Sequence, residues 1–250
     1  MIALITGATS GIGRACAIRF AKGGYDIIAT GRNTAGLEEV GNEIEALGRE
    51  ALLLQYDVRS RTECEDAVDA IPPEWREIDV LVNNAGLALG LEPVHEGSFD
   101  DWETMIDTNI KGLLYMTRLI VPGMIERGKG HIINIGSVAG DAAYADGGVY
   151  CATKSAVKTI SDGLRIELAG TPLRVTNVKP GLVQTNFSNV RFHGDSGRAD
   201  NVYKGIKPLS GDDIADVAFF AASAPEHVQI ADVLVLATNQ GSGSVICRKA

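Results

Sequence analysis

Short apolar runs alternate with longer amphipathic stretches along most of this chain, and this alternation restricts its fold more than any other feature. Runs rich in Ile, Leu and Val that are bounded by turn residues are typical of strands covered on both faces. The predicted strands are residues 2–6, 26–30, 51–55, 79–82, 131–135, 174–178 and 232–236. Because helical patterns separate most of them, this order predicts a parallel sheet.

The amphipathic stretches between the strands predict the helices. They cover residues 11–22, 35–47, 61–71, 99–126, 148–168 and 212–222. Right-handed crossovers place such helices on both faces of a doubly wound sheet, so the expected fold class is α/β. The length of 250 residues fits a single domain, 1–250. Residues 185–210 show no regular pattern, and we expect them to form a lid over a site.

Acidic residues outnumber basic ones, 32 to 23, which gives a formal net charge of −9. This balance argues against nucleic acid or an anionic membrane as the main partner. The four cysteines, Cys16, Cys64, Cys151 and Cys247, form no CxxC pair, so neither a metal site nor a disulfide framework is expected. With no long apolar run and no leader pattern at the N-terminus, the sequence predicts a cytoplasmic protein without a membrane segment.

A glycine-rich turn follows the first predicted strand and opens the first predicted helix. Glycine at the start permits the tight turn, and the later glycines let the backbone approach a pyrophosphate group. The free N–H groups and the positive dipole end of the helix also favour a phosphate. The residues expected to bind a dinucleotide here are Gly7, Thr9, Ser10, Gly11, Ile12 and Gly13. A plain tight turn is the alternative interpretation.

The end of the second predicted strand indicates which dinucleotide binds. An acidic residue at this place would bind the ribose 2′-hydroxyl of NAD, but the sequence has Arg32 followed by Asn33. A guanidinium group suits a 2′-phosphate, so the sequence predicts NADP(H) rather than NAD(H). Ser10 and Asn33 could add hydrogen bonds to the same phosphate. The alternative is that Arg32 is a solvated loop residue.

A tyrosine and a lysine lie one helical turn apart after the fifth predicted strand. Tyr150 and Lys154 share one face of the predicted helix 148–168, and Ser137 follows the carboxyl end of the preceding strand. A free phenol has a pKa of about 10, but a nearby ammonium such as Lys154 favours the phenolate. Ser137 could then hold a substrate oxygen while Tyr150 moves the proton. On spacing alone, the Tyr150–Lys154 pair could also arise by chance.

Together these motifs resemble the short-chain dehydrogenases/reductases, over residues 1 to about 236. The resemblance rests on Gly7, Gly11 and Gly13, the run 83–86, Asn109, Ser137, Tyr150, Lys154 and the pair Pro180 and Gly181. It implies a Rossmann-like, seven-stranded sheet, a Ser/Tyr/Lys site, contact of Lys154 with the nicotinamide ribose, and a water held by Asn109 in a proton relay. By the same resemblance, further cofactor contacts come from Asp57, Val58, Asn84, Ala85, Gly86, Pro180, Gly181, Val183 and Thr185.

Several of these residues have ordinary structural alternatives. Asn109 could be a polar residue on a helix, and Asp57 could cap the helix that follows the third strand. Pro180 and Gly181 could form only a turn, and Ser137 could be a strand-end serine. A catalytically inactive NADP-binding protein is also conceivable, but the presence of all four catalytic residues argues against it.

A narrower resemblance points to the substrate. Segments 86–90, 101–109, 115–118 and 187–192 are similar to the NADP-dependent 3-hydroxy acid dehydrogenases, which act on serine, L-allo-threonine and 3-hydroxyisobutyrate or reduce malonic semialdehyde. Arg191 in the predicted lid could hold a substrate carboxylate. The segment 184–186 is one residue shorter than the subfamily pattern, and the tail after residue 237 diverges. An NADPH-dependent carbonyl or 3-oxoacyl reductase is the alternative.

The predicted helices 99–126 and 148–168 carry apolar residues on more than one face. Surplus apolar area favours burial against another subunit. Members of the resembled family pair these helices and often form tetramers, so a homotetramer is expected. The alternative is that both helices simply pack on the sheet.

Overall fold

The computed structural model describes residues 1–248 and contains one seven-stranded sheet in which every strand pair is parallel. The strands are β1 (Ile2–Ile5), β2 (Asp26–Gly31), β3 (Ala51–Gln55), β4 (Ile78–Asn83), β5 (His131–Ile135), β6 (Arg174–Pro180) and β7 (Asp232–Val235). Their order in the sheet is β3-β2-β1-β4-β5-β6-β7, so the direction of winding reverses between β1 and β4. The predicted doubly wound α/β fold is confirmed, and every predicted strand is found.

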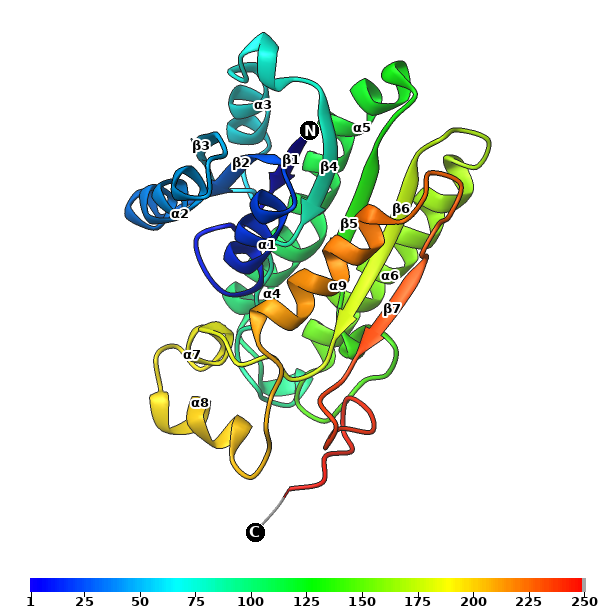
Figure 1. Ribbon diagram of the computed structural model, residues 1–250. Coiled ribbons are helices and arrows are strands. Elements are labelled where there is room, and N and C mark those ends of the chain that lie inside the picture. Colours follow the sequence, from blue (N-terminus) through cyan, green and yellow to red (C-terminus); the bar gives the residue numbers. More distant parts are fainter. Residues whose placement is uncertain (249–250) are drawn as a thin grey trace.

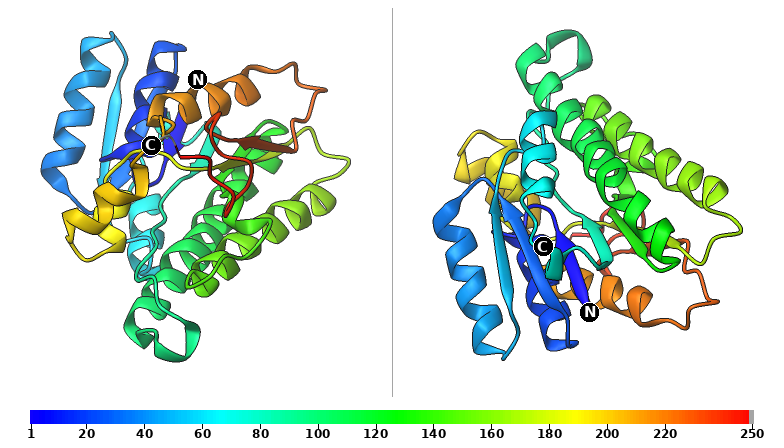
Figure 2. Two further views of the ribbon diagram at one scale, coloured as in Figure 1. Left: turned by 90° about the horizontal axis from the view of Figure 1, so that it is seen from below. Right: turned by 90° about the horizontal axis from the view of Figure 1, so that it is seen from above.

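Helices cover both faces of the sheet (Figure 2). One apolar core joins the sheet to α1 (Gly11–Lys22), α2 (Thr34–Ala46) and α9 (Gly211–Ser223). The other core joins it to α3 (Arg61–Asp69), α5 (Leu113–Arg127) and α6 (Gly148–Glu167). Burial on both faces explains why the strand sequences are almost continuously apolar.

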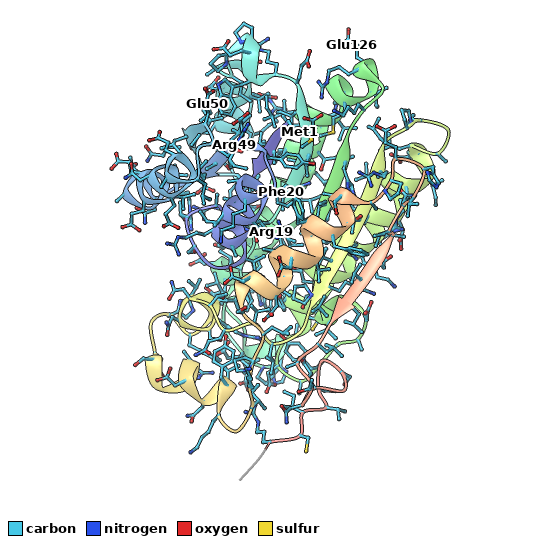
Figure 3. The ribbon with its side chains drawn as sticks, viewed as in Figure 1. Met1, Arg19, Phe20, Arg49, Glu50 and Glu126 are labelled. Atoms are coloured by element: carbon cyan, nitrogen blue, oxygen red, sulfur yellow. The ribbon has the colours of Figure 1, made fainter. Side chains whose placement is uncertain are left out.

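The packing of α1 on α9 closes the first of these faces. Phe20 on α1 meets Phe219 on α9 edge to face, with 5.4 Å between ring centroids. Arg19 binds Asp216 with 2.6 Å between Nε and Oδ1, and its guanidinium carbon lies 3.8 Å from the centroid of the Phe219 ring. Figure 3 shows Arg19 and Phe20 on α1, beside α9. This contact fixes the helix whose N-terminus borders the site.

The predicted helix 99–126 is found as an unbroken helical stretch, but its middle is a π-helical turn that the sequence pattern did not indicate. The structure has α4 (Phe99–Ile106), a π-helical turn (Asp107–Gly112) and then α5. Gly112 packs so closely on residue 58 that a Cβ at 112 would lie 2.9 Å from Cγ2 of Val58. The wide turn also places Asn109 against the loop after β4, where it bonds to Leu87. Such turns are frequent at functional sites.

Residues 185–210 are not irregular, as the sequence pattern indicated, but contain α7 (Phe187–Arg191) and α8 (Ser196–Tyr203). The hydroxyl groups of Ser188 and Tyr203 join the two helices at 2.8 Å, and the Tyr203 hydroxyl also donates to the Val183 carbonyl at 3.0 Å. Figure 1 shows both helices (yellow) at the end of the molecule where the C-terminal tail (red) lies. Helices this short are stabilised by such tertiary contacts rather than by their own sequence.

Residues 238–248 pack against the turn after β6 and against α8. Gln240 and Ile246 form an antiparallel bridge, and the Gln240 side-chain oxygen accepts the Leu182 N–H at 2.9 Å. The Arg248 Nη2 donates to the Val202 carbonyl at 3.0 Å, near the end of α8. The tail therefore braces the turn after β6 and the segment 185–210. The predicted domain 1–250 includes residues 249 and 250, which lie outside the described part.

Candidate active site

A cleft of about 710 Å³ lies beyond the carboxyl ends of β1, β4, β5 and β6. This is the place where the winding of the sheet reverses, and ligands of open α/β sheets bind at such points. The helices α7 and α8 contribute its outer wall. The predicted site residues that line it are Gly7, Thr9, Ser10, Gly11, Ile12, Arg32, Asn33, Asp57, Val58, Asn84, Ala85, Gly86, Ser137, Tyr150, Lys154, Pro180, Gly181, Val183, Thr185 and Arg191.

The turn between β1 and α1 requires its glycines. Gly7 and Gly11 have φ angles of 67° and 54°, in the left-handed region that glycine adopts without strain. Gly13 does not line the cleft, but a Cβ there would overlap the Gly7 carbonyl and the Asn84 side chain. The Asn84 Nδ2 donates to the carbonyls of Thr6 and Gly7, at 2.8 and 3.1 Å. The resulting cradle exposes backbone N–H groups at a helix N-terminus.

Charged side chains gather at the β2 and β3 side of the cleft. The side chain of Arg32 is 61% exposed, and its Nη1 lies 3.6 Å from Oδ2 of Asp57. Burial alone would raise the pKa of Asp57, but hydrogen bonds from Arg59 and the charge of Arg32 hold it below 3.8. The Asn33 side chain accepts the Gly36 N–H at 3.3 Å and so caps α2. On this side of the cleft, Arg32 is the cation to which a phosphate group could bind.

Asp57 does not cap α3, contrary to the structural alternative. The Ser60 side chain does so by accepting the Glu63 N–H at 3.3 Å. Asp57 instead holds Arg59, with 2.6 Å between Nη2 and Oδ2. Its carboxylate is thereby kept at the edge of the cleft.

Ser137, Tyr150 and Lys154 line the same cleft, and each is no more than 9% exposed. The Ser137 Oγ accepts the Ala139 N–H at 3.1 Å, which orients the hydroxyl at the end of β5. The Lys154 Nζ donates to the Ile135 carbonyl at 2.9 Å. A chance Tyr-x-x-x-Lys pair would not converge with a strand-end serine in this way.

Burial controls the protonation of these groups. It raises the pKa of the Tyr150 phenol, and Tyr144 adds to the rise, while the Ser137 hydroxyl and the charge of Arg191 act in the opposite direction. Burial also lowers the pKa of Lys154 from 10.5 to about 8. We expected Lys154 to lower the pKa of Tyr150. In the protein alone the loss of hydration has the largest effect on the pKa of Tyr150, so the neutral phenol is favoured.

Asn109 does not line the cleft but supports its wall. Its Oδ1 accepts the Leu87 N–H at 2.9 Å, and its Nδ2 donates to the Leu87 carbonyl at 2.8 Å and to Thr153 Oγ1 at 3.0 Å. These bonds fix the loop after β4 against α6. These bonds give Asn109 a structural role, and the predicted water contact stays a prediction.

Arg191 joins α7 to the opposite wall of the cleft. Its Nε donates to the Gly90 carbonyl and its Nη1 to the Tyr144 hydroxyl, both at 3.0 Å. The guanidinium carbon lies 5.8 Å from the centroid of the Tyr150 ring. The Nη2 atom is buried and has no hydrogen-bond acceptor among the described residues. The Arg191 guanidinium, which can donate a further hydrogen bond, thus lies beside the predicted catalytic phenol of Tyr150.

Sequence reasoning missed several residues of this region. Phe187 meets the Tyr150 ring edge to face, with 5.7 Å between centroids, and lines the cleft with Leu87 and Val190. Tyr144 bonds to Arg191, and Thr153 bonds to Asn109. Neither Tyr144 nor Thr153 lines the cleft itself. The aromatic residues within 185–210 were the only local signal for Phe187. Nothing in the spacing of Tyr144 or Thr153 pointed to their partners.

Other kinds of site find no support in the described part of the chain. Residues 1–248 contain no group of three or more His, Cys, Asp or Glu side chains that could hold a metal ion. The helices in this range include none that is long and apolar enough to cross a membrane. Cys16, Cys64 and Cys151 are buried, Cys247 is exposed, and all four are free thiols.

Comparison with known proteins decides the family. The sequence profile described as short chain dehydrogenase matches residues 1–195. The chain belongs to this family. As a short-chain dehydrogenase it is an oxidoreductase, and the resemblance predicted from its motifs is confirmed.

Individual short-chain dehydrogenases are similar over nearly the whole chain. The NADP-dependent 3-hydroxy acid dehydrogenase YdfG of Salmonella typhi is 51% identical over 241 residues, which cover 96% of each chain. The NADP-dependent 3-hydroxy acid dehydrogenase of Schizosaccharomyces pombe is 44% identical over 98% of this chain and 96% of its own. A structure described as the closed form of serine dehydrogenase complexed with NADP⁺ has a TM-score of 0.94 and 47% identity, with 100% of both chains covered.

Proposed function

We propose that this short-chain dehydrogenase is an NADP-dependent 3-hydroxy acid dehydrogenase. The reaction is 3-hydroxy acid + NADP⁺ ⇌ 3-oxo acid + NADPH + H⁺. Serine, L-allo-threonine and 3-hydroxyisobutyrate are the proposed substrates for oxidation, and malonic semialdehyde is the proposed substrate for reduction. The names of the similar proteins from Salmonella typhi and Schizosaccharomyces pombe support this proposal.

The residues of the cleft fit NADP(H). The β1–α1 turn forms a glycine cradle in which a Cβ at residue 13 would overlap backbone, as expected for a pyrophosphate site. Arg32 would hold the 2′-phosphate, and Asp57, Val58 and Asn84 would border the adenosine half. Lys154, Pro180, Gly181, Val183 and Thr185 would border the nicotinamide half. When bound, the cofactor accepts or supplies the hydride.

The protein's own groups hold the substrate oxygen and move its proton. Ser137 donates to this oxygen from a hydroxyl that the backbone of residue 139 keeps in place. Tyr150 exchanges the proton with the same oxygen. Burial favours the neutral phenol, which suits the donor role in reduction. In oxidation the phenolate needs neighbouring positive charge, which Arg191 and the ammonium form of Lys154 supply.

The position of Arg191 carries the assignment of an acid substrate. Its guanidinium lies beside Tyr150 in the cleft and has one buried nitrogen without an acceptor. A buried donor of a charged group is costly when unpaired, and a substrate carboxylate would supply the missing acceptor. The segment 185–210 would act as the lid that brings Arg191 over the substrate. Exclusion of water beneath this lid would strengthen the ion pair.

We also propose a homotetramer in the cytoplasm. Large apolar side chains are exposed on the helices that cover one face of the sheet, namely Ile106 on α4, Leu114 and Ile125 on α5 and Ile166 on α6. Ile166 is 76% exposed. Pairing of α5 and α6 between subunits would bury this surface. Light scattering of the purified protein tests the proposal, and a monomer at micromolar concentration would contradict it.

A substrate panel tests the proposed function. Formation of reduced cofactor is followed with NADP⁺ or NAD⁺ and with 3-hydroxyisobutyrate, L-allo-threonine, serine or an uncharged primary alcohol of similar size. The expected result is turnover of the acids with NADP⁺ at a kcat/KM well above that of the alcohol. Equal or better turnover of uncharged compounds would contradict it and would favour an NADPH-dependent carbonyl or 3-oxoacyl reductase.

A further inference from the structure

One aromatic residue behind the cleft wall has no part in the function described above. Tyr144 lies in the loop between β5 and α6, and it is not among the residues that line the cleft. Its hydroxyl accepts a hydrogen bond from Nη1 of Arg191 at 3.0 Å. The guanidinium carbon of Arg191 also lies 5.6 Å from the centroid of the Tyr144 ring. Tyr144 therefore contacts a cleft-lining cation from outside the cleft.

The backbone around Tyr144 is shaped to hold this ring. Asp146 has a φ angle of 63°, an uncommon left-handed conformation for a residue other than glycine, and the Gly147 N–H donates to the Tyr144 carbonyl at 3.3 Å. A Cβ at residue 147 would overlap the Tyr144 ring, so the ring packs directly against this glycine. The same turn leads directly into α6, which carries Tyr150 and Lys154. The turn thus fixes Tyr144 relative to the catalytic helix.

Arg191 has two hydrogen-bonded anchors, one on the loop after β4 and one on the loop before α6. The Gly90 carbonyl accepts from Nε, and the Tyr144 hydroxyl accepts from Nη1. Neither anchor carries a negative charge, so the positive charge of Arg191 is not neutralised by them. Nη2 remains without an acceptor in the described part of the chain. An arginine held in this way is oriented but still available to an anion.

We propose that Tyr144 is a positioning residue that sets the preference of the site for carboxylate substrates by aiming Arg191. This inference rests on the proposed function of the site, because the anion that Arg191 receives is the carboxylate of the 3-hydroxy acid. Tyr144 does not touch the substrate. Its hydroxyl removes rotational freedom from the guanidinium before the substrate binds, which increases affinity for the carboxylate through preorganisation.

The test compares Tyr144→Phe with the parent protein on a 3-hydroxy acid and on an uncharged alcohol of similar size. We expect KM for the acid to rise about tenfold while kcat changes much less, so that the acid-to-alcohol ratio of kcat/KM falls by a similar factor. In an Arg191→Ala background, Tyr144→Phe should have no additional effect on this ratio, because the hydroxyl acts only through Arg191.

Tyr203→Phe is the matched control. It removes a hydroxyl that joins α7 to α8 and to Val183 but has no hydrogen bond to Arg191. This variant should keep the acid-to-alcohol ratio of the parent. An equal loss of the ratio in both variants would assign the effect to order of the lid and overturn the proposal. Additive effects of Tyr144→Phe and Arg191→Ala would also overturn it.

A separate measurement distinguishes failure of this inference from failure of the proposed function. Malonate is used as a non-reacting carboxylate, and its inhibition constant is measured against reduction of an uncharged aldehyde. The constant should rise about tenfold in Tyr144→Phe, whichever substrate the enzyme prefers. If the parent oxidises no 3-hydroxy acid, the proposed function fails while this arm still tests Tyr144. Equal malonate inhibition of both proteins would overturn the role of Tyr144.

Discussion

The β1–α1 turn and the segment 185–210 border the same cleft, but different contacts hold them. The turn depends on residue type within a few positions: Gly7 and Gly11 have positive φ angles, and a Cβ at Gly13 would overlap backbone. The segment depends on distant partners. Arg191 and Gly90 exchange two backbone-directed hydrogen bonds across 101 positions, and His193 reaches Asp101 at 3.1 Å. The glycine turn of the nucleotide side is therefore encoded mainly in local residue types, with Asn84 as a distant brace, whereas the substrate side is assembled by the tertiary fold.

This difference predicts how substitutions separate the two functions. A change in the turn should weaken cofactor binding for every substrate. A change in the lid should alter substrate preference and leave cofactor affinity nearly constant. Of the following four variants, given in order of decreasing expected effect, the first three test this separation and the fourth tests the burial of Lys154.

The largest effect is expected for Gly13→Ala. The added methyl group overlaps the Gly7 carbonyl and the Asn84 amide, so the turn must shift and the affinity for NADPH should fall about 100-fold. Titration of cofactor fluorescence measures this. The matched control is Gly163→Ala on α6, where an added Cβ meets nothing within 4 Å and should bring slight stabilisation. Unchanged NADPH affinity in Gly13→Ala would contradict the local encoding of the turn.

Arg191→Ala should change substrate preference instead. Loss of the cation should lower kcat/KM for a 3-hydroxy acid about 30-fold, while the dissociation constant of NADPH changes by no more than about twofold. Steady-state kinetics and cofactor titration measure the two quantities. The control is Arg198→Ala, which removes another lid arginine whose side chain is 50% exposed. Parallel losses of acid turnover and NADPH affinity in Arg191→Ala would break the separation.

Arg32→Ala should act only on the choice between cofactors. The preference for NADPH over NADH, measured as the ratio of kcat/KM values, should fall about tenfold because one charged contact to the 2′-phosphate is lost. Arg61→Ala serves as control, since the Arg61 side chain is 70% exposed and does not line the cleft. A constant ratio in Arg32→Ala would remove this residue from the cofactor site.

The smallest effect is expected for Lys154, which lies between the nucleotide side and the substrate side of the cleft. Burial lowers its pKa from 10.5 to about 8, so between these values the unfolded chain keeps a proton that the folded protein has released. Its contribution to the free energy of unfolding therefore rises with pH, by up to about 1.4 kcal/mol for each pH unit. Urea unfolding should show the parent gaining stability relative to Lys154→Met over this range. Lys158→Met, one turn further along the same helix with a side chain that is 41% exposed, should show the same pH dependence as the parent.

The sheet and the nucleotide side could be predicted from the sequence because local residue patterns indicate both. Continuous apolar runs marked all seven strands, and glycine spacing marked the turn after β1. The π-helical turn between α4 and α5 was not predicted because the apolar pattern continues through it. Gly112 in this turn packs closely on Val58, a tertiary contact that the local pattern does not encode.

The site could be predicted only in part for the same reason. Ser137, Tyr150 and Lys154 occur in a recognisable order, and the structure brings them together. The helices α7 and α8 were missed because their stability comes from partners such as Val183 and Gly90 rather than from their own sequence. The pKa of Tyr150 was expected to fall, but the degree of burial that raises it cannot be inferred from residue spacing.

Tyr150 is the residue on which the proposed chemistry depends most. The decisive measurement is single-turnover oxidation of a 3-hydroxy acid by Tyr150→Phe with saturating NADP⁺, together with titration of NADPH binding. The account predicts a rate about 10²- to 10⁴-fold below that of the parent, with NADPH affinity reduced by no more than about threefold. Turnover by Tyr150→Phe at the rate of the parent would contradict it.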